Sequence, residues 1–256
     1  MAGRLSGSAL LDRSIPGGTD VLADLSEFPI TRRWPARHPH RLQLYSLPTA
    51  NGVKVSIMLE ETGLPYEAHR VETSRQETRT PEFLSLNPDG KIPVILDPDG
   101  PDGQPLALCE SGAILLYLAE KTGKLLSPHP AERIETIQWV FFQMAGIGPM
   151  FAQFGFFHAF EGKDYDDKRP LERYRTEVQR LLMVLEKRLG GRSWIMGEAY
   201  SIADVSLLGW VRHLVGFYRA GDLVGYDGLK NVPPWLERGL ARPAVQRGLG
   251  IPARPQ

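Results

Sequence analysis

Apolar and polar residues alternate in several short segments of the first half of the chain. Alternation with a period of two is typical of a strand with one buried face. It begins at Leu42-Gln43-Leu44-Tyr45, and strand-like segments recur at residues 66–71, 92–96 and 106–109. The last two are joined by residues 97–103, which are rich in Pro, Asp and Gly and predict a hairpin.

Segments with helical character separate these strands. Residues 53–61 predict a helix that ends at Gly63, and residues 113–121 predict an apolar helix that ends before Gly123. Thr80 followed by Pro81 predicts the start of a short helix, because proline is tolerated at the first helical position. The order strand, helix, strand, helix, hairpin, helix predicts a small α/β domain over residues 41–124.

After a proline-rich linker the pattern is helical throughout, which predicts an all-helical domain over residues 130–250. Residues 131–145 form one predicted helix, which the glycines and proline at 146–149 bend or break. Residues 171–189 carry an apolar stripe at helical spacing. Residues 200–205 open a further helix with a predicted capping box, in which Ser201 and Asp204 bond each other's backbone amides.

Residues 1–40 are rich in Gly, Pro, Arg and Ser and show no sustained period. An extended arm and plain disorder are both compatible with that composition. Phe28 and Trp34 favour an arm that lies partly on the body of the protein. Whether the arm contributes to a site or an interface stays open at this point.

Composition excludes several classes of function. The chain has 30 basic and 30 acidic residues, so it lacks the basic footprint of a nucleic-acid-binding protein. Cys109 is the only cysteine, which excludes an internal disulfide and a cysteine-based zinc site, and no metal is predicted. No run approaches the ~20 apolar residues that span a bilayer, and the N-terminus lacks a signal-peptide core. We therefore expect a cytoplasmic protein without a membrane partner.

Polar groups are predicted at three strand ends of the α/β domain, where ligands collect in such sheets. They are the turn at Thr49 and Asn51, the backbone beside Pro93, and the pair Glu110 and Ser111. Ser111 precedes a helix whose positive N-terminus suits a carboxylate, and Glu110 can pair with an amine. An amino-acid-like head group carries both a carboxylate and an amine, so it needs both kinds of partner. The alternative for Ser111 is a simple helix cap.

Pro93 stands directly before the apolar run at residues 94–96. Proline cannot donate to a sheet ladder, so it belongs at a strand start, an edge or a bulge. This position leaves the backbone of Ile92 free to bond another group. Cis bonds are a minority of roughly 5–6% of X-Pro bonds, so the sequence alone argues against a cis Ile92–Pro93 bond.

These residues resemble a known family. Residues 44–55, the run Asn87-Pro88-Asp89-Gly90-Lys91-Ile92-Pro93, and residues 110–118 beginning Glu110-Ser111 are similar to the cytosolic glutathione transferases. The Thr-x-Asn-Gly turn resembles the bacterial nu class, which is related to the yeast nitrogen regulator with prion behaviour. The resemblance covers about residues 41–250 in the family's order.

The resemblance implies a thioredoxin-like first domain with cis Pro93, followed by an all-α helical bundle. It implies that glutathione is bound, with Thr49 and Asn51 at its sulfur, the Ile92 backbone along its cysteinyl part, and Glu110 and Ser111 at its γ-glutamyl end. It implies a homodimer in which the second domain reaches a neighbouring subunit's site; the matching positions are Gln143 and Arg173. Lys91 either approaches a carboxylate or is a solvated turn lysine.

Further side chains near the predicted site are also candidates for contacts with the ligand. The family often has Gln or His at the position of Thr78, so either Thr78 or Gln76 is a candidate for that contact. Tyr45 and Ser46 invite comparison with catalytic residues of other transferase classes, although the alternation around Tyr45 favours a core position. Cys109 is interpreted as an inert core thiol.

The resemblance implies glutathione-dependent chemistry on a small-molecule disulfide or electrophile. With no catalytic cysteine predicted, the nucleophile is the thiolate of bound glutathione. The nu class favours disulfide reduction over addition to an electrophile. Two alternatives stay open: a binding or regulatory module with weak or no catalysis, and a dehydratase- or dehalogenase-like homologue.

Overall fold

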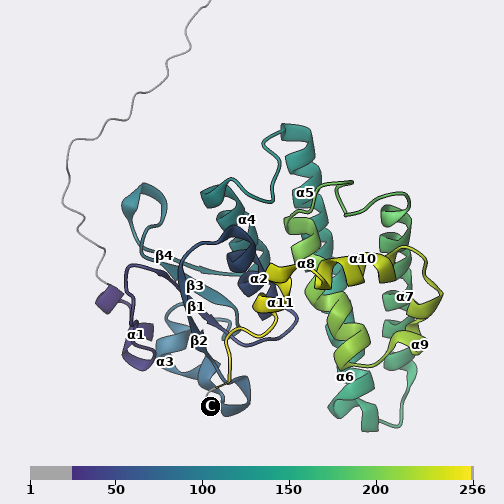
Figure 1. The fold of residues 1–256 in the computed structure, drawn as a ribbon. Helices are drawn as coiled ribbons and strands as arrows, with labels where there is room; N and C mark the ends of the chain where they lie inside the picture. Colours follow the sequence, from purple (N-terminus) through teal and green to yellow (C-terminus); the bar gives the residue numbers. More distant parts are fainter. Residues whose placement is uncertain (1–24, 255–256) are drawn as a thin grey trace, which may run out of the picture.

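The computed structural model describes residues 25–254, which form a small helix-covered sheet beside a group of longer helices (Figure 1). The sheet has four strands in the order β2-β1-β3-β4. They are β1 (Leu42–Ser46), β2 (Tyr66–Arg70), β3 (Val94–Asp97) and β4 (Leu106–Cys109). β1 pairs in parallel with β2, whereas β3 is antiparallel to both β1 and β4. This is the predicted thioredoxin-like arrangement.

The two faces of the sheet are covered by different elements. α2 (Gly52–Thr62) and α4 (Ser111–Thr122) pack on the face that carries Leu44 and Ile95. Alternate residues of the same strands, Tyr45 among them, point to the opposite face and pack with α3 (Pro81–Leu84). Both α2 and α4 end at a left-handed glycine, as the sequence predicts.

The described part of the N-terminal arm covers this second face. It contains the short helices η1 (Leu25–Glu27) and α1 (Ile30–Arg33). Trp34 meets Tyr45 edge to face at 6.0 Å and donates its indole N–H to the Arg70 carbonyl at 3.2 Å. Residues 25–34 are therefore part of the folded body, on the side of the sheet away from α2. The remainder of the predicted arm, residues 1–24, lies outside the described residues.

The second half is helical, as predicted. Its helices are α5 (Pro130–Phe142), α6 (Gly148–Ala159), α7 (Arg169–Leu189), α8 (Ile202–Arg212), α9 (Gly221–Val224), α10 (Val232–Leu240) and α11 (Pro243–Gly248). Two π-helical turns, Gln143–Ile147 and His213–Phe217, continue α5 and α8. Short 3-10 turns occur in both halves: Thr73–Arg75, Glu77–Arg79 and Pro101–Gly103 in the first, and Glu161–Asp164 and Tyr226–Gly228 in the second.

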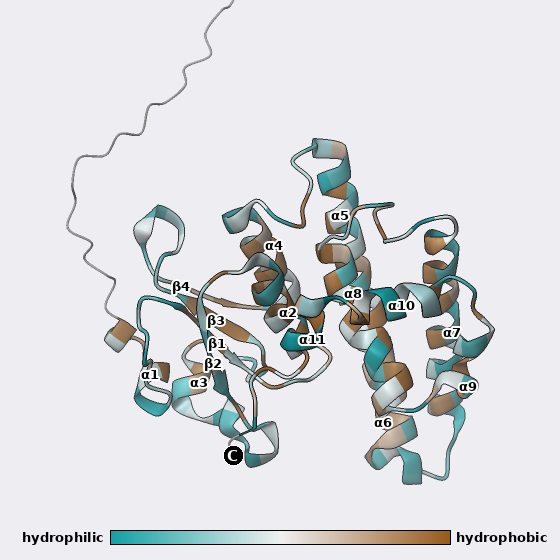
Figure 2. Cartoon of the chain, in the orientation of Figure 1, coloured by the Kyte–Doolittle hydropathy of each residue, from teal (hydrophilic) through white to brown (hydrophobic). Residues whose placement is uncertain are grey.

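The predicted interruption near residue 146 takes an unexpected form. The chain does not break there; a π turn widens the helix, which then runs on through α6. π turns are often found at functional positions, and this one carries Gln143. α7 matches its predicted stripe, with hydrophobic and hydrophilic residues on opposite sides along its length (Figure 2).

The continuous helix Pro130–Ala159 corrects the prediction that no run of the chain approaches the length and apolar character of a membrane span. It is 30 residues long and, by length and composition alone, apolar enough to cross a membrane. A core helix of a soluble protein meets the same criteria, so the finding is weak evidence for a membrane span. Its C-terminal part packs along α7, where Phe151 and Phe154 are fully buried.

The two halves are joined closely around α2 and α8. The α8 start has the predicted capping box, in which Asp204 accepts from the Ser201 amide at 3.0 Å. Further along α8, a Cβ on Gly209 would lie 2.4 Å from the Ala50 carbonyl oxygen, so only glycine lets the turn before α2 approach this helix. On the other side of α2, Ser56 donates to the Gly248 carbonyl of α11 at 2.6 Å.

Candidate active site

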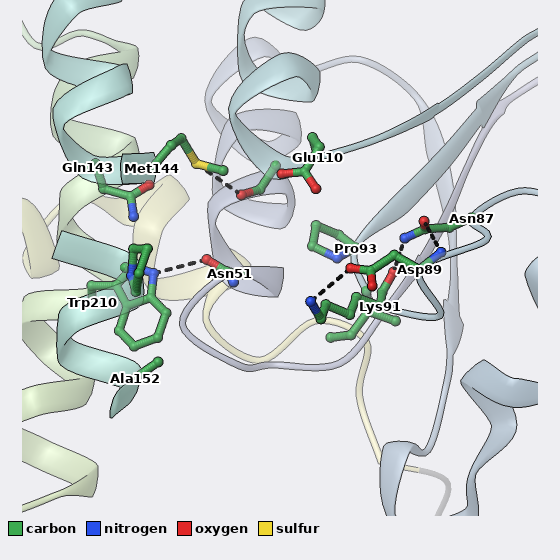
Figure 3. A pocket seen from close by; sticks show the side chains of 14 residues that line it. Asn51, Asn87, Asp89, Lys91, Pro93, Glu110, Gln143, Met144, Ala152 and Trp210 are labelled. Atoms are coloured by element: carbon green, nitrogen blue, oxygen red, sulfur yellow. Dashed lines mark hydrogen bonds and ion pairs between the residues drawn. The ribbon is translucent and has the colours of Figure 1, made fainter. Parts of the chain in front are cut away.

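A cavity of about 400 Å³ lies between the end of the sheet and the helical half (Figure 3). Most predicted site residues line it: Asn51, Lys91, Ile92, Pro93, Glu110, Ser111 and Gln143. Thr49 instead lines an adjoining cavity of about 530 Å³, together with Gln76, Thr78, Lys91 and Ile92. Arg173 is exposed on α7 and lines none of the cavities described.

The Ile92–Pro93 peptide bond is cis, as the resemblance implies. The register of β1 and β3 begins at Val94, so the backbone of Ile92 stands outside the sheet ladder while lining the cavity. Asn87 shapes this turn by donating to the Lys91 carbonyl at 2.7 Å. The Lys91 side chain is 72% exposed and pairs with Asp89 at 2.8 Å, which favours a solvated turn lysine at the edge of the cavity.

Glu110 and Ser111 occupy the junction of β4 and α4. Glu110 has a positive φ of 66°, which is uncommon for a residue with a side chain. Its carbonyl accepts the first bond of α4, from the Ile114 amide at 2.9 Å. Ser111 is consequently the first helical residue rather than the cap, which corrects the simple capping interpretation. Its hydroxyl lies at the cavity and donates to the Met144 sulfur at 3.7 Å.

Lys54, in the first turn of α2, is a site residue that sequence reasoning missed. Its side chain is fully buried, and its Nζ donates to Ser111 Oγ at 3.2 Å and to Gln143 Oε1. Burial lowers the pKa of Lys54 to about 7, although the Glu110 charge acts in the opposite direction. The only available indication was a lysine among the apolar residues that open a helix.

Gln143 reaches the cavity from the π turn between α5 and α6. The structure thus places it in the site of its own chain, where the resemblance had associated it with a neighbouring subunit. Figure 3 shows it beside Met144, across the cavity from Pro93. The helical half therefore forms one wall of the cavity and the sheet half the other.

Asn51 is oriented by a second residue that sequence reasoning missed. Trp210, on α8, donates its indole N–H to Asn51 Oδ1 at 2.9 Å (Figure 3). Because an indole can only donate, this bond uses the amide oxygen and leaves the amide nitrogen of Asn51 as a donor. Thr49 Oγ1 likewise accepts from the Gly52 amide at 3.1 Å, so its hydroxyl hydrogen is available to another acceptor.

The other candidate side chains lie away from the cavity. Tyr45 is fully buried on the opposite face of the sheet, stacked on His69 at 4.8 Å, and burial raises its pKa far above the ordinary value. Ser46 is buried and donates weakly to the Leu47 carbonyl at 3.4 Å. Cys109 is half-buried and packs against the hydrophobic cluster around Tyr45 and Phe83, on the sheet face that the N-terminal arm covers. Within residues 25–254, no cysteine lines a cavity described here.

Comparison with known proteins identifies the architecture. Residues 50–121 match the profile of the glutathione S-transferase N-terminal domain, and residues 170–238 match that of the C-terminal domain. The disulfide-bond oxidoreductase YfcG of Escherichia coli is 44% identical over 209 residues, covering 81% of this chain and 94% of the relative. The chain belongs to the glutathione S-transferase family.

Two solved glutathione transferases are similar over nearly their whole length. One, from Burkholderia graminis, has two glutathione molecules bound per subunit; it is 62% identical with a TM-score of 0.91, covering 93% of this chain and 99% of that chain. The other, from Pseudomonas putida, has one glutathione disulfide bound per subunit. It is 63% identical with a TM-score of 0.88, covering 89% of this chain and 99% of that chain. The predicted family, fold and nu-class relation are confirmed.

Proposed function

We propose that this glutathione S-transferase family member is a glutathione-dependent disulfide-bond oxidoreductase. One observation carries the proposal: a single cavity combines the free backbone of Ile92, the Glu110–Ser111 junction and the Asn51 amide, and no cysteine lines it. A site without its own thiol needs a bound thiol as nucleophile. The YfcG relative and the glutathione disulfide bound in the Pseudomonas putida enzyme support the same chemistry.

In this proposal glutathione lies along the cavity. The Ile92 backbone pairs with its cysteinyl residue, Glu110 and Ser111 hold its γ-glutamyl end, and its sulfur lies near Thr49 and Asn51. Donors beside the sulfur stabilise the thiolate, which is the reactive form of a thiol. The neighbouring cavity with Gln76 and Thr78 then receives the glycyl end, near Lys91.

The proposed reaction is thiol–disulfide exchange in two steps. The bound glutathione thiolate attacks one sulfur of a small disulfide, which forms a mixed disulfide and releases one thiolate. The thiolate of a second glutathione then attacks the glutathione sulfur of the mixed disulfide, which releases the second thiol and gives glutathione disulfide. The balance is one disulfide reduced and two glutathiones oxidised. The two glutathiones bound per subunit in the Burkholderia graminis enzyme support a site that holds both.

The decisive experiment measures both chemistries on the full chain. Reduction of 2-hydroxyethyl disulfide is followed through glutathione reductase and NADPH, and conjugation of 1-chloro-2,4-dinitrobenzene is followed in parallel. We expect disulfide reduction to dominate and Asn51→Ala to lower it. Dominant conjugation would refute the reductase assignment. Absence of both activities, with no glutathione binding by calorimetry, would favour the non-enzymatic binding module.

We further propose a homodimer in the cytoplasm. An apolar groove of about 300 Å³ lies between α4 and α5, lined by residues that include Leu116, Ile137 and Phe141. Phe141 is 65% exposed, a large apolar side chain for a monomer to leave in water. A second copy seated there would cover it, and the exposed Arg173 then fits a role at a neighbouring subunit's ligand. Light scattering should give a dimer for the full chain and a monomer for Phe141→Glu.

A further inference from the structure

Lys54 lies behind the cavity, where the two halves of the protein meet. Its side chain extends from α2 to Ser111 at the start of α4 and to Gln143 in the π turn of the helical half. The Met144 sulfur is a third neighbour at 3.6 Å. These three partners are neutral, and Glu110 is the charged group that acts on Lys54 from the neighbouring junction. Among residues 25–254, the ammonium is therefore buried without a carboxylate in contact with it.

The contacts of Lys54 fix the direction of two other hydrogen-bonding groups. In its charged form Lys54 has three donors and no acceptor, so both Ser111 and Gln143 then accept from it. Ser111 consequently keeps its hydroxyl hydrogen for a different acceptor: in this structure it donates to the Met144 sulfur at 3.7 Å, a weak acceptor that a ligand carboxylate would replace. Gln143 turns its oxygen to Lys54 and its amide nitrogen toward Gly148, where an added Cβ would lie 2.8 Å from that nitrogen. Gln143, Ser111 and Gly148 all line the cavity.

This end of the cavity thus presents donors to a ligand. The Ser111 hydroxyl and the Gln143 amide join the free amides at the start of α4, whose helix end favours negative charge. Burial of an ammonium without an opposite charge is costly, and the low pKa of Lys54, about 7, reflects that cost. A ligand carboxylate at these donors would bring a negative charge toward the buried ammonium.

We propose that Lys54 is a positioning residue for the γ-glutamyl end of the ligand: it fixes Ser111 and Gln143 as donors facing the cavity, and the carboxylate they hold supplies its missing counter-charge. This inference rests on the proposed function, because it takes glutathione as the ligand. It assigns Lys54 no contact with the ligand and no part in the sulfur chemistry.

The first test compares Lys54→Met with the control Lys124→Met. Methionine keeps an unbranched side chain in the buried slot, and Lys124 donates to the Thr62 carbonyl outside the cavity. Two ligands are titrated by calorimetry: S-methylglutathione, and its analogue with γ-aminobutyrate in place of the γ-glutamyl residue, which lacks only that carboxylate. We expect Lys54→Met to weaken S-methylglutathione binding about tenfold to hundredfold and the analogue by less than about threefold. Lys124→Met should bind both like the parent.

Two results would overturn the inference. One is a Lys54→Met protein that binds S-methylglutathione within about twofold of the parent. The other is an equal loss for both ligands, which is what a merely structural lysine would give. A parent protein that binds neither ligand would instead refute the proposed function itself. The two failures are therefore distinguishable.

A second measurement needs no variant and holds even if Lys54→Met fails to fold. A lysine with a pKa of about 7 is mostly uncharged in the free protein at about pH 8, and a nearby carboxylate restores its proton. Calorimetry of the parent in two buffers with different ionisation enthalpies counts protons taken up. S-methylglutathione has no thiol proton to release. We expect it to take up about half a proton or more beyond the analogue; equal counts would overturn the inference.

Discussion

The bond between Trp210 and Asn51 gives a sharp test of how the site activates a thiol. In Trp210→Phe the ring is kept and only the indole N–H is lost, so Asn51 no longer has a donor to hold its oxygen. A neutral hydrogen bond contributes about 0.5–1.5 kcal/mol net, or about twofold to twelvefold in the preference for one amide orientation. The donor is 7% exposed, but Asn51 faces the cavity, where water can replace it. We therefore expect the lower part of that range, about twofold to fivefold.

The expected result is a fall of that size in kcat/KM for disulfide reduction, with a higher pKa for the thiol of bound glutathione. The thiol pKa is read from thiolate absorbance in a pH titration of the complex. The matched control is Trp139→Phe, because the indole N–H of Trp139 is buried and has no hydrogen-bond partner in the part of the chain that the structure describes. Equal effects of the two substitutions, or an unchanged thiol pKa in Trp210→Phe, would refute the orientation argument.

Other predictions concern the thiol, a long-range cap and the buried lysine. Thr49→Ala should lower turnover and raise the pKa of the bound thiol, whereas Thr49→Ser should restore both; unchanged kinetics in Thr49→Ala would contradict its role. Glu186 on α7 accepts from the three successive amides of residues 230–232, which lead into α10, at 2.8–3.0 Å, so Glu186→Ala should cost about 2–3 kcal/mol in urea unfolding. Glu177→Ala, which removes an exposed ion pair, should cost less than about 1 kcal/mol. The pKa of Lys54 is about 7 when folded, below its ordinary 10.5, so between those values the unfolded chain binds more protons. Unfolding free energy of the ligand-free protein should therefore rise with pH above 7, by at most about 1.4 kcal/mol per pH unit, and this rise should be absent in Lys54→Met.

Local pattern carried most of the fold prediction. Alternation identified β1, and the glycines after α2 and α4 have the positive φ of 73° and 65° that their positions implied. The capping box at Ser201 was equally readable, because both partners lie within one helical turn. Such features depend on residues close together in the sequence, which explains why they were predicted.

The contacts that build the site are not local. Trp210 and Asn51 are 159 residues apart, and Lys54 and Gln143 are 89 apart. Nothing in the spacing of these residues indicates that they meet. The pattern of polar groups at strand ends indicated the residues of the sheet half, and the resemblance added Gln143 and Arg173. Lys54 and Trp210 became visible only once the helical half was packed against the sheet. The π turn was missed because glycine and proline at 146–149 normally indicate an end of a helix.

The missing side chain of Gly209 has a consequence for protein engineering. The turn that carries Thr49 and Asn51 rests against α8 through this gap, and the neighbouring Trp210 holds the Asn51 amide. A chimera that joins this sheet half to the helical half of a relative would lose the α8 residues that hold the turn of Thr49 and Asn51 in place. A chimera should therefore keep the contacts that cross the domain boundary. A chimera that keeps Gly209 and Trp210 of α8 is expected to retain activity, whereas one that is joined at the linker between the two halves, and lacks them, is expected to lose it.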